Sequence, residues 1–181
     1  MSAQQICVRP AQEVDTVAMV KVNVDTLRAT YPAFYPADLL AARNYETVEA
    51  AWRHMLWESP EIENYALVAE NDAGQIVGVL ICGPSTSHAA YQGEVFTLFV
   101  LPQFHKQGIG KKLMRCAAEQ LFALGMVNMI VWVLADNPAR QFYEAIGGKW
   151  VQEREIKRGD VMMREIGYGW KNIETAFSSF V

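Results

Sequence analysis

The sequence predicts a single α/β domain whose central mixed sheet contains a parallel βαβ unit. Strand and helix patterns follow one another in the order strand, helices, hairpin, strand, helix, strand, helix, hairpin. Segment 127–134 is a nearly continuous apolar run, which is typical of a parallel strand buried on both faces. The chain has 181 residues, of which 51% are hydrophobic, and no repeat or linker divides it, so one substantial core can form.

The N-terminal third predicts one strand and three helices. Residues 6–9 alternate in polarity and are followed by Pro10, which indicates a short strand. Apolar residues recur at helical spacing from 13 to 27. An aromatic, proline-containing loop at 31–36 then separates this helix from two shorter ones, at 37–42 and 47–57.

The rest of the chain alternates strands and helices. Segments 65–70 and 76–82 flank an Asn-Asp-Ala-Gly turn and predict a hairpin. A strand at 95–101 leads into a helix at 109–124, and Gly125 marks its end. After the buried strand at 127–134, Asn137 and Pro138 predict the N-cap and first residue of a helix that extends to 146. A last strand pair is expected within 150–168, turning at 158–160.

Composition excludes several classes of partner. The formal net charge is −4 and no block of Lys and Arg stands out, so we expect neither nucleic acid nor a membrane as partner. The acidic excess suits a cationic substrate, but ordinary solubility charge explains it better. Apolar stretches are too short to span a bilayer, and the first residues show no secretory pattern, which favours a cytoplasmic protein. The three cysteines and three histidines lack metal-ligand spacing, so no metal site is expected.

The segment before the helix at 109–124 has the features of an anion-binding loop. Gly108 and Gly110 allow close approach of the backbone, and a helix N-terminus presents free N–H groups to an anion. Lys106, Lys111 and Lys112 add positive charge, which suits a diphosphate. The Walker A and dinucleotide-binding patterns both fail here. A helix that merely begins with glycines remains the alternative.

At these residues the sequence resembles the GNAT superfamily of N-acetyltransferases. The family motif Arg/Gln-x-x-Gly-x-Gly/Ala follows a strand ending in Val-x-Pro, and here Val100-Leu101-Pro102 precedes His105-Lys106-Gln107-Gly108-Ile109-Gly110. His105 departs from the usual Arg or Gln. A second segment, from Asn137 to Gly148, resembles the family's Asn-x-x-Arg-x-Phe-Tyr-Glu-x-x-Gly-Gly stretch.

The resemblance implies a fold and an activity. The fold is a mostly antiparallel mixed sheet, splayed between the fourth and fifth strands, in one N-acetyltransferase domain spanning 1–181. Residues 64–148 are expected to form the acetyl-CoA core, and residues 13–60 to shape the acceptor site. The activity is acetyl transfer from acetyl-CoA to a primary amine of a small molecule or a protein, by direct attack in a ternary complex. A non-catalytic acetyl-CoA-binding module is the alternative, and a homodimer is allowed.

The resemblance also implies residue roles on the cofactor side. The backbone of Leu98, Phe99 and Val100, on a bulged strand, would hold the pantetheine arm and the thioester oxygen. Asn137 would bind the arm, and the Tyr143 phenol would protonate the departing sulfur, whereas core packing is accepted for Phe142. The diphosphate would lie on the loop, and the expected contacts are His105, Lys106, Gln107, Gly108, Ile109, Gly110 and Lys111.

The base and the acceptor site are less constrained. Glu94 shares one face of its strand with Phe96, Leu98 and Val100 by the period of two. The resemblance implies that a carboxylate in this strand accepts the amine proton, often through water, so Glu94 is the candidate base. An exposed glutamate at a strand end is an equal alternative. We expect the aromatic loop to form a substrate wall through Tyr31, Phe34 and Tyr35. Core packing is expected for Trp52 and Trp57, as are structural roles for the thiols Cys82 and Cys116.

Overall fold

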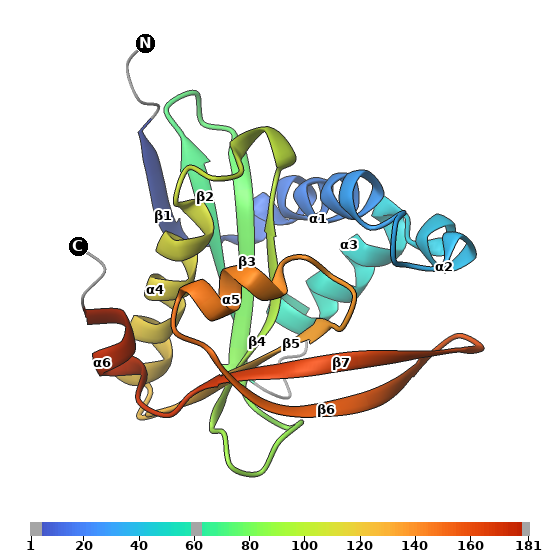
Figure 1. The fold of residues 1–181 in the computed structure, drawn as a ribbon. Helices are drawn as coiled ribbons and strands as arrows, with labels where there is room; N and C mark the ends of the chain where they lie inside the picture. The colour runs from blue at the N-terminus through green and yellow to red at the C-terminus, as the bar shows by residue number, and fades with distance from the viewer. Residues whose placement is uncertain (1–4, 59–62, 179–181) are drawn as a thin grey trace.

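A seven-stranded mixed sheet organises the molecule (Figure 1). The computed structural model describes residues 5–58 and 63–178. The strand order is β1-β2-β3-β4-β5-β7-β6, and in these residues every neighbouring pair is antiparallel except β4 and β5. This confirms the predicted mixed, mostly antiparallel sheet with a parallel centre. The strands are β1 (Ile6–Pro10), β2 (Tyr65–Asn71), β3 (Ile76–Pro84), β4 (Gly93–Val100), β5 (Met129–Leu134), β6 (Lys149–Arg158) and β7 (Val161–Trp170).

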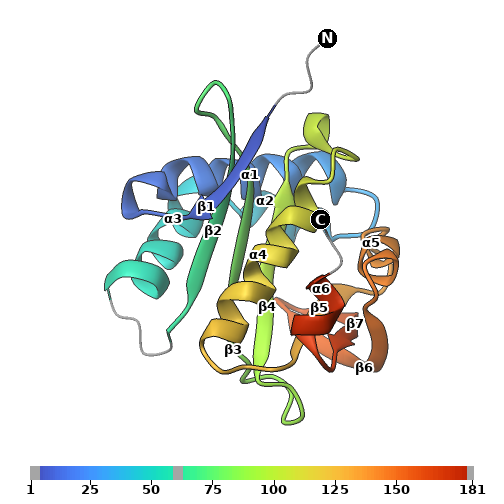
Figure 2. The ribbon, with the colours of Figure 1, turned by 90° about the vertical axis from the view of Figure 1, so that its left-hand side faces the viewer.

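Helices cover both faces of this sheet. Figure 2 shows α4 and α6 in front of the sheet and α1 behind it. The buried face of α4 includes Leu113, Ala117 and Leu121, as its spacing predicts. None of the helices in the described part of the chain is long and apolar enough to cross a membrane. The helices are α1 (Thr16–Thr30), α2 (Ala37–Ala42), α3 (Tyr45–Arg53), α4 (Ile109–Ala123), α5 (Arg140–Ala145) and α6 (Ile173–Ser178).

Several predicted helix boundaries are wrong. The helix predicted from residue 13 begins with a 3₁₀ turn (Glu13–Asp15) and continues as α1 to Thr30. The helix predicted at 47–57 begins at Tyr45, because Asn44 Oδ1 accepts the Thr47 N–H at 2.9 Å, and it ends in a π-helical turn (His54–Glu58). Helix α6 was not expected, since six residues carry little periodicity of their own.

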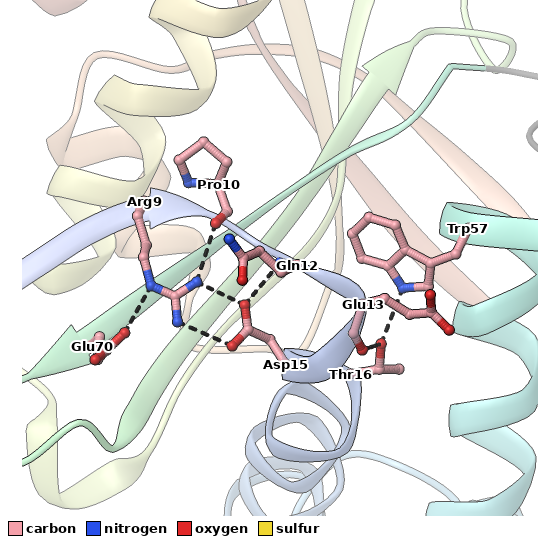
Figure 3. Close-up of polar contacts among 8 residues, drawn as sticks. All are labelled: Arg9, Pro10, Gln12, Glu13, Asp15, Thr16, Trp57 and Glu70. Atoms are coloured by element: carbon pink, nitrogen blue, oxygen red, sulfur yellow. Dashed lines mark hydrogen bonds and ion pairs between the residues drawn. The ribbon is translucent and has the colours of Figure 1, made fainter.

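A hydrogen-bonded cluster fixes the start of α1 to the edge of the sheet (Figure 3). The Arg9 guanidinium on β1 donates to both Asp15 carboxylate oxygens at 2.7 and 3.0 Å, and to Glu70 on β2 at 2.7 Å. Asp15 Oδ2 also accepts the Gln12 N–H at 2.8 Å, which caps the first turn. These bonds, chiefly the one from Arg9, hold the pKa of Asp15 below its usual value.

A second bond in the same region ties α3 to α1. The Trp57 indole N–H donates to the Thr16 hydroxyl at 3.0 Å, and that hydroxyl donates to the Glu13 carbonyl at 2.7 Å (Figure 3). Trp52 is buried and Trp57 is half-buried, so the predicted packing role is confirmed for Trp52. The N-terminal end of α1 is therefore held both to the edge of the sheet and to the turn that follows α3.

Replacing Asp15 with Asn should lower the free energy of unfolding by about 1–2 kcal/mol at pH 7, a figure kept small because Arg9 is one-third exposed. Because folding depresses the pKa of Asp15, its stabilisation is present above the unfolded pKa of about 4 and is lost as pH falls through the lower folded value. Denaturant unfolding at pH 7 and below pH 4 should show the difference from wild type shrinking in acid.

The exposed pair Glu153–Arg164 provides the control, with an N···O distance of 2.9 Å. Glu153→Gln should change stability by less than about 0.5 kcal/mol at either pH. An Asp15→Asn difference that stays constant with pH would contradict the assignment.

Candidate active site

The parallel pairing of β4 and β5 is short, and a cavity opens where it stops. Only Gly93–Val95 of β4 pair with Met129–Val131 of β5. Beyond this point β4 stays paired with β3, and β5 with β7. The diverging ends line a cavity of about 320 Å³. This confirms the predicted splay between the fourth and fifth strands.

A β-bulge at Phe96 changes which side chains of β4 face which side. Val95 pairs with Cys82 and Thr97 with the adjacent Ile81, so Phe96 is an extra residue without a partner on β3. The predicted common face of Glu94, Phe96, Leu98 and Val100 is therefore wrong. Leu98 and Val100 are paired with Leu80 and Gly78, on the face that α4 covers. Glu94 lies on the opposite face, and Phe96 is 41% exposed.

Two phenols, of Tyr143 and Tyr31, line the cavity. Tyr143 is 6% exposed, and its ring stacks on Tyr168 with centroids 6.2 Å apart. Burial, and to a smaller extent the neighbouring Tyr31, raises the pKa of Tyr143. Burial also raises the pKa of Tyr31 to about 12. Both phenols therefore keep their protons at neutral pH and can act as donors.

Asn137 bridges the two sides of this cavity. Its Nδ2 donates to the Tyr31 hydroxyl at 3.2 Å, and its Oδ1 accepts the Ala139 N–H at 2.9 Å. The prediction that Asn137 is the N-cap is wrong. Residues 138 and 139 form a turn, and α5 begins only at Arg140, with Ala139 as its N-cap. The side chain stabilises that turn and points its amide nitrogen at the aromatic loop.

The glycine loop has the local geometry of an anion cradle. Gly108 adopts φ 78° and ψ 1°, a left-handed conformation that other residues reach at a cost, and it immediately precedes α4. Ile109 and Gly110 begin α4, and the first N–H groups of an α-helix have no acceptor within the helix. Lys106 is also left-handed, at φ 60°.

The second glycine of the loop has a packing role. A Cβ atom at Gly110 would lie 3.2 Å from Cζ of Phe142 on α5, so the absent side chain lets the two helices approach. Phe142 is half-buried against the core, in line with the packing role expected for it. His105 is exposed, and its Nε2–H donates to the Val100 carbonyl at 2.7 Å. The loop is therefore braced by the strand that it leaves.

The predicted site residues separate into three groups. Leu98, Phe99, Asn137, Tyr143, Tyr31 and Tyr35 line the cavity together. The residues from Val100 to Lys111 form the end of β4, the glycine loop and the first turn of α4. They directly follow the lining residue Phe99 in the chain. Phe34 does not line the cavity. It packs on the outside of Tyr31, with ring centroids 4.8 Å apart, and faces a separate hollow.

Glu94 lies one residue before the end of the parallel pairing and does not line the cavity. It is 6% exposed, so the alternative of an exposed strand-end glutamate is wrong. Its Oε2 accepts hydrogen bonds from Ser85 at 2.9 Å and Ser87 at 2.5 Å. The Trp132 indole N–H, from a side of the cavity, donates to Ser87 Oγ at 2.8 Å. Glu94 is thus connected to the cavity through Ser87 and Trp132.

Several polar residues that line the cavity were not predicted from the sequence. Glu165 on β7 is buried and accepts two bonds from Arg154, at 2.9 and 2.7 Å. Arg154 also lies over the Trp132 ring, 3.7 Å from its centroid. Arg43 and Arg158 complete the charged part of the lining. Charged residues at 164 and 165 within a mostly apolar strand were the one available signal.

The thiols are not placed to act as nucleophiles. Cys82 is fully buried, and burial raises the pKa of its thiol to about 12. Cys116 is half-buried, and its thiol pKa is also raised by burial. Both groups are held in the unreactive thiol form at neutral pH.

Comparisons with known proteins agree with this geometry. Residues 25–147 match the model of the acetyltransferase (GNAT) family. The uncharacterized N-acetyltransferase YuaI of Bacillus subtilis is 31% identical over 169 residues, which cover 93% of this chain and 94% of that protein.

Solved structures share the fold at lower identity. The PaiA N-acetyltransferase of Thermoplasma acidophilum in complex with coenzyme A has a TM-score of 0.67 and 18% identity, covering 89% of this chain and 98% of that one. The structure of yncA from Salmonella typhimurium with acetyl-CoA has a TM-score of 0.67 and 15% identity, with coverages of 92% and 93%. The family match over residues 25–147 and the nearly full-length Bacillus relative show that this chain belongs to the acetyltransferase (GNAT) family.

Proposed function

We propose that this chain transfers the acetyl group of acetyl-CoA to a primary amine by direct attack within a ternary complex. The observation that carries the proposal is the position of Tyr143, a buried, protonated phenol that lines the cavity between β4 and β5. A proton donor at this place suits the departure of a thiolate. The unreactive thiols favour direct attack over an acetyl-cysteine intermediate.

The loop and the splayed strands fit acetyl-CoA. Diphosphate oxygens would accept the N–H groups of Gly108, Ile109 and Gly110, with His105, Lys106, Gln107 and Lys111 around them. The backbone of Leu98, Phe99 and Val100 would hold the arm, together with the Asn137 amide. When bound, acetyl-CoA supplies an acyl group activated as a thioester. A backbone N–H near Phe99 or Val100 would stabilise charge that develops on the acyl oxygen.

Proton movement involves two further groups of this chain. Tyr143 would give its phenolic proton to the leaving sulfur. Burial raises the pKa of this phenol, so it keeps its proton until a thiolate forms beside it. Glu94 remains the proposed base and would take the amine proton through water, while the bonds from Ser87 and from Trp132 behind it hold the carboxylate in place. Tyr31 and Tyr35 would border the acceptor amine, with Phe34 supporting Tyr31 from outside.

Gly108→Asp should abolish measurable acetyl-CoA binding, because a carboxylate would repel the diphosphate and the side chain would obstruct the backbone's approach. Gly125→Asp is the matched control. Gly125 follows α4, has φ 84°, and a Cβ at either glycine would meet no protein atom within 4 Å. Both variants carry the same backbone strain, but calorimetry should show wild-type affinity for the control alone. Equal affinities for the two variants would disprove the cradle.

Tyr143→Phe keeps the ring and its stacking but removes the proton donor. Turnover should fall by about 10²-fold to 10⁴-fold, while acetyl-CoA affinity and the melting temperature change little. Thiol release with a panel of amines, a binding isotherm and a thermal melt on one preparation measure all three quantities.

Tyr168→Phe is the control for this experiment. It removes a neighbouring hydroxyl that donates to Glu144 outside the cavity lining, so it should lower stability and leave turnover near wild type. Full activity in Tyr143→Phe would assign the proton to another donor. If the wild-type chain binds acetyl-CoA but acetylates no amine, a non-catalytic acetyl-CoA-binding module is the better description.

A further inference from the structure

The cavity carries positive charge on its acceptor side, although the chain as a whole has a formal net charge of −4. Its charged lining residues are Arg43, Arg158 and Glu165. Oε2 of Glu165 already accepts two hydrogen bonds from the Arg154 guanidinium, at 2.9 and 2.7 Å. Its Oε1 lies 3.8 Å from Nη2 of Arg158. Two guanidinium groups, of Arg154 and Arg158, lie against this one carboxylate, and Arg43 adds a third to the cavity lining, which leaves a local excess of positive charge.

Arg43 is the cation of this group that has no carboxylate partner in the described chain. Its Nε donates to Oδ1 of the fully buried Asn23 at 3.3 Å, so the guanidinium points inward although the residue as a whole is exposed. Burial lowers its pKa, and the nearby Arg158 lowers it further. An anion placed beside these two cations would relieve their mutual repulsion.

The two arginines come from separate elements that meet beside the cavity. Arg43 directly follows α2, and Arg158 ends β6 at the tip of the β6–β7 hairpin, which extends to the side of the molecule where α2 lies (Figure 1). A Cβ atom at Gly159 would lie 2.9 Å from Cδ2 of Leu39, so the hairpin tip and α2 are in close contact. This contact brings Arg43 and Arg158 together.

We propose that the acceptor is a small amine that also carries a carboxylate, and that Arg43, with Arg158, binds this carboxylate. This inference rests on the proposed acetyl transfer and names the class of its acceptor. The carboxylate would face the arginines, and the amine would lie nearer Tyr143. The aromatic lining by Tyr35, Phe96 and Trp132 suits an apolar side chain. Polyamines and aminoglycosides are poor acceptors here, since they would place cations against cations.

The test compares amino acids with the amines that differ from them only by loss of the carboxylate. Wild type should show at least a 10-fold higher kcat/KM for the amino acid of a pair. Arg43→Gln should reduce kcat/KM for the amino acid by about 10-fold to 100-fold, and change it for the decarboxylated amine by less than about 3-fold. Arg43→Lys should retain part of the preference. Lys157→Gln, a neighbouring charge on the hairpin that does not line the cavity, should change neither value.

A binding arm separates this inference from the proposed activity. Without acetyl-CoA, an N-acetyl amino acid should raise the melting temperature of the wild type and not that of Arg43→Gln. Wild-type preference for polyamines, or equal losses for both amines in Arg43→Gln, would overturn the acceptor class while leaving acetyl transfer intact. Absence of any melting shift would overturn it as well. Thiol release with no amine at all would instead count against the proposed function.

Discussion

Parallel pairing between β4 and β5 ends at Val95 and Val131, and the geometry of the site depends on where it ends. Both strands keep an antiparallel partner on their outer edge, β3 for one and β7 for the other, so the sheet tolerates the separation. Backbone groups along the inner edges are left to face a cavity. A polar, extended arm can pair with such edges, because unpaired strand edges are ready hydrogen-bonding surfaces.

The bulge at Phe96 gives the two sides of the cavity different chemistry. It puts Leu98 and Val100 on the face of the sheet that α4 covers, and the glycine loop lies just before α4. Phe99 lies on the other face, with its ring centroid 6.1 Å from that of Tyr31 in the aromatic loop. Packing of Phe142 against Gly110 then sets α5, and with it Tyr143, next to the loop. The bulge at Phe96 and the absent side chain of Gly110 thus place the proposed cofactor side, the proton donor and the acceptor side next to one another.

The fold and the cofactor loop were readable from sequence, because glycines at a helix start and a continuous apolar strand are local signals. A functional role for Tyr143 could be predicted only from the family motif, since a lone tyrosine on a helix usually indicates packing. Register was harder: the bulge at Phe96 shifts the face of every later residue, and polarity alternation cannot reveal it. Arg43 and Arg158 are far apart in the chain, so only the meeting of α2 with the hairpin brings them together.

Every proposed role depends on the opening between β4 and β5 receiving the acetyl-CoA arm. Hydrogen exchange measured by mass spectrometry, with and without acetyl-CoA, tests this most directly, because amides at an unpaired edge exchange quickly until a ligand bonds them. We expect slower exchange in the peptide spanning residues 96–101 and unchanged exchange in residues 149–158 of β6. Saturating acetyl-CoA that slows exchange elsewhere but leaves residues 96–101 unchanged would contradict the claim.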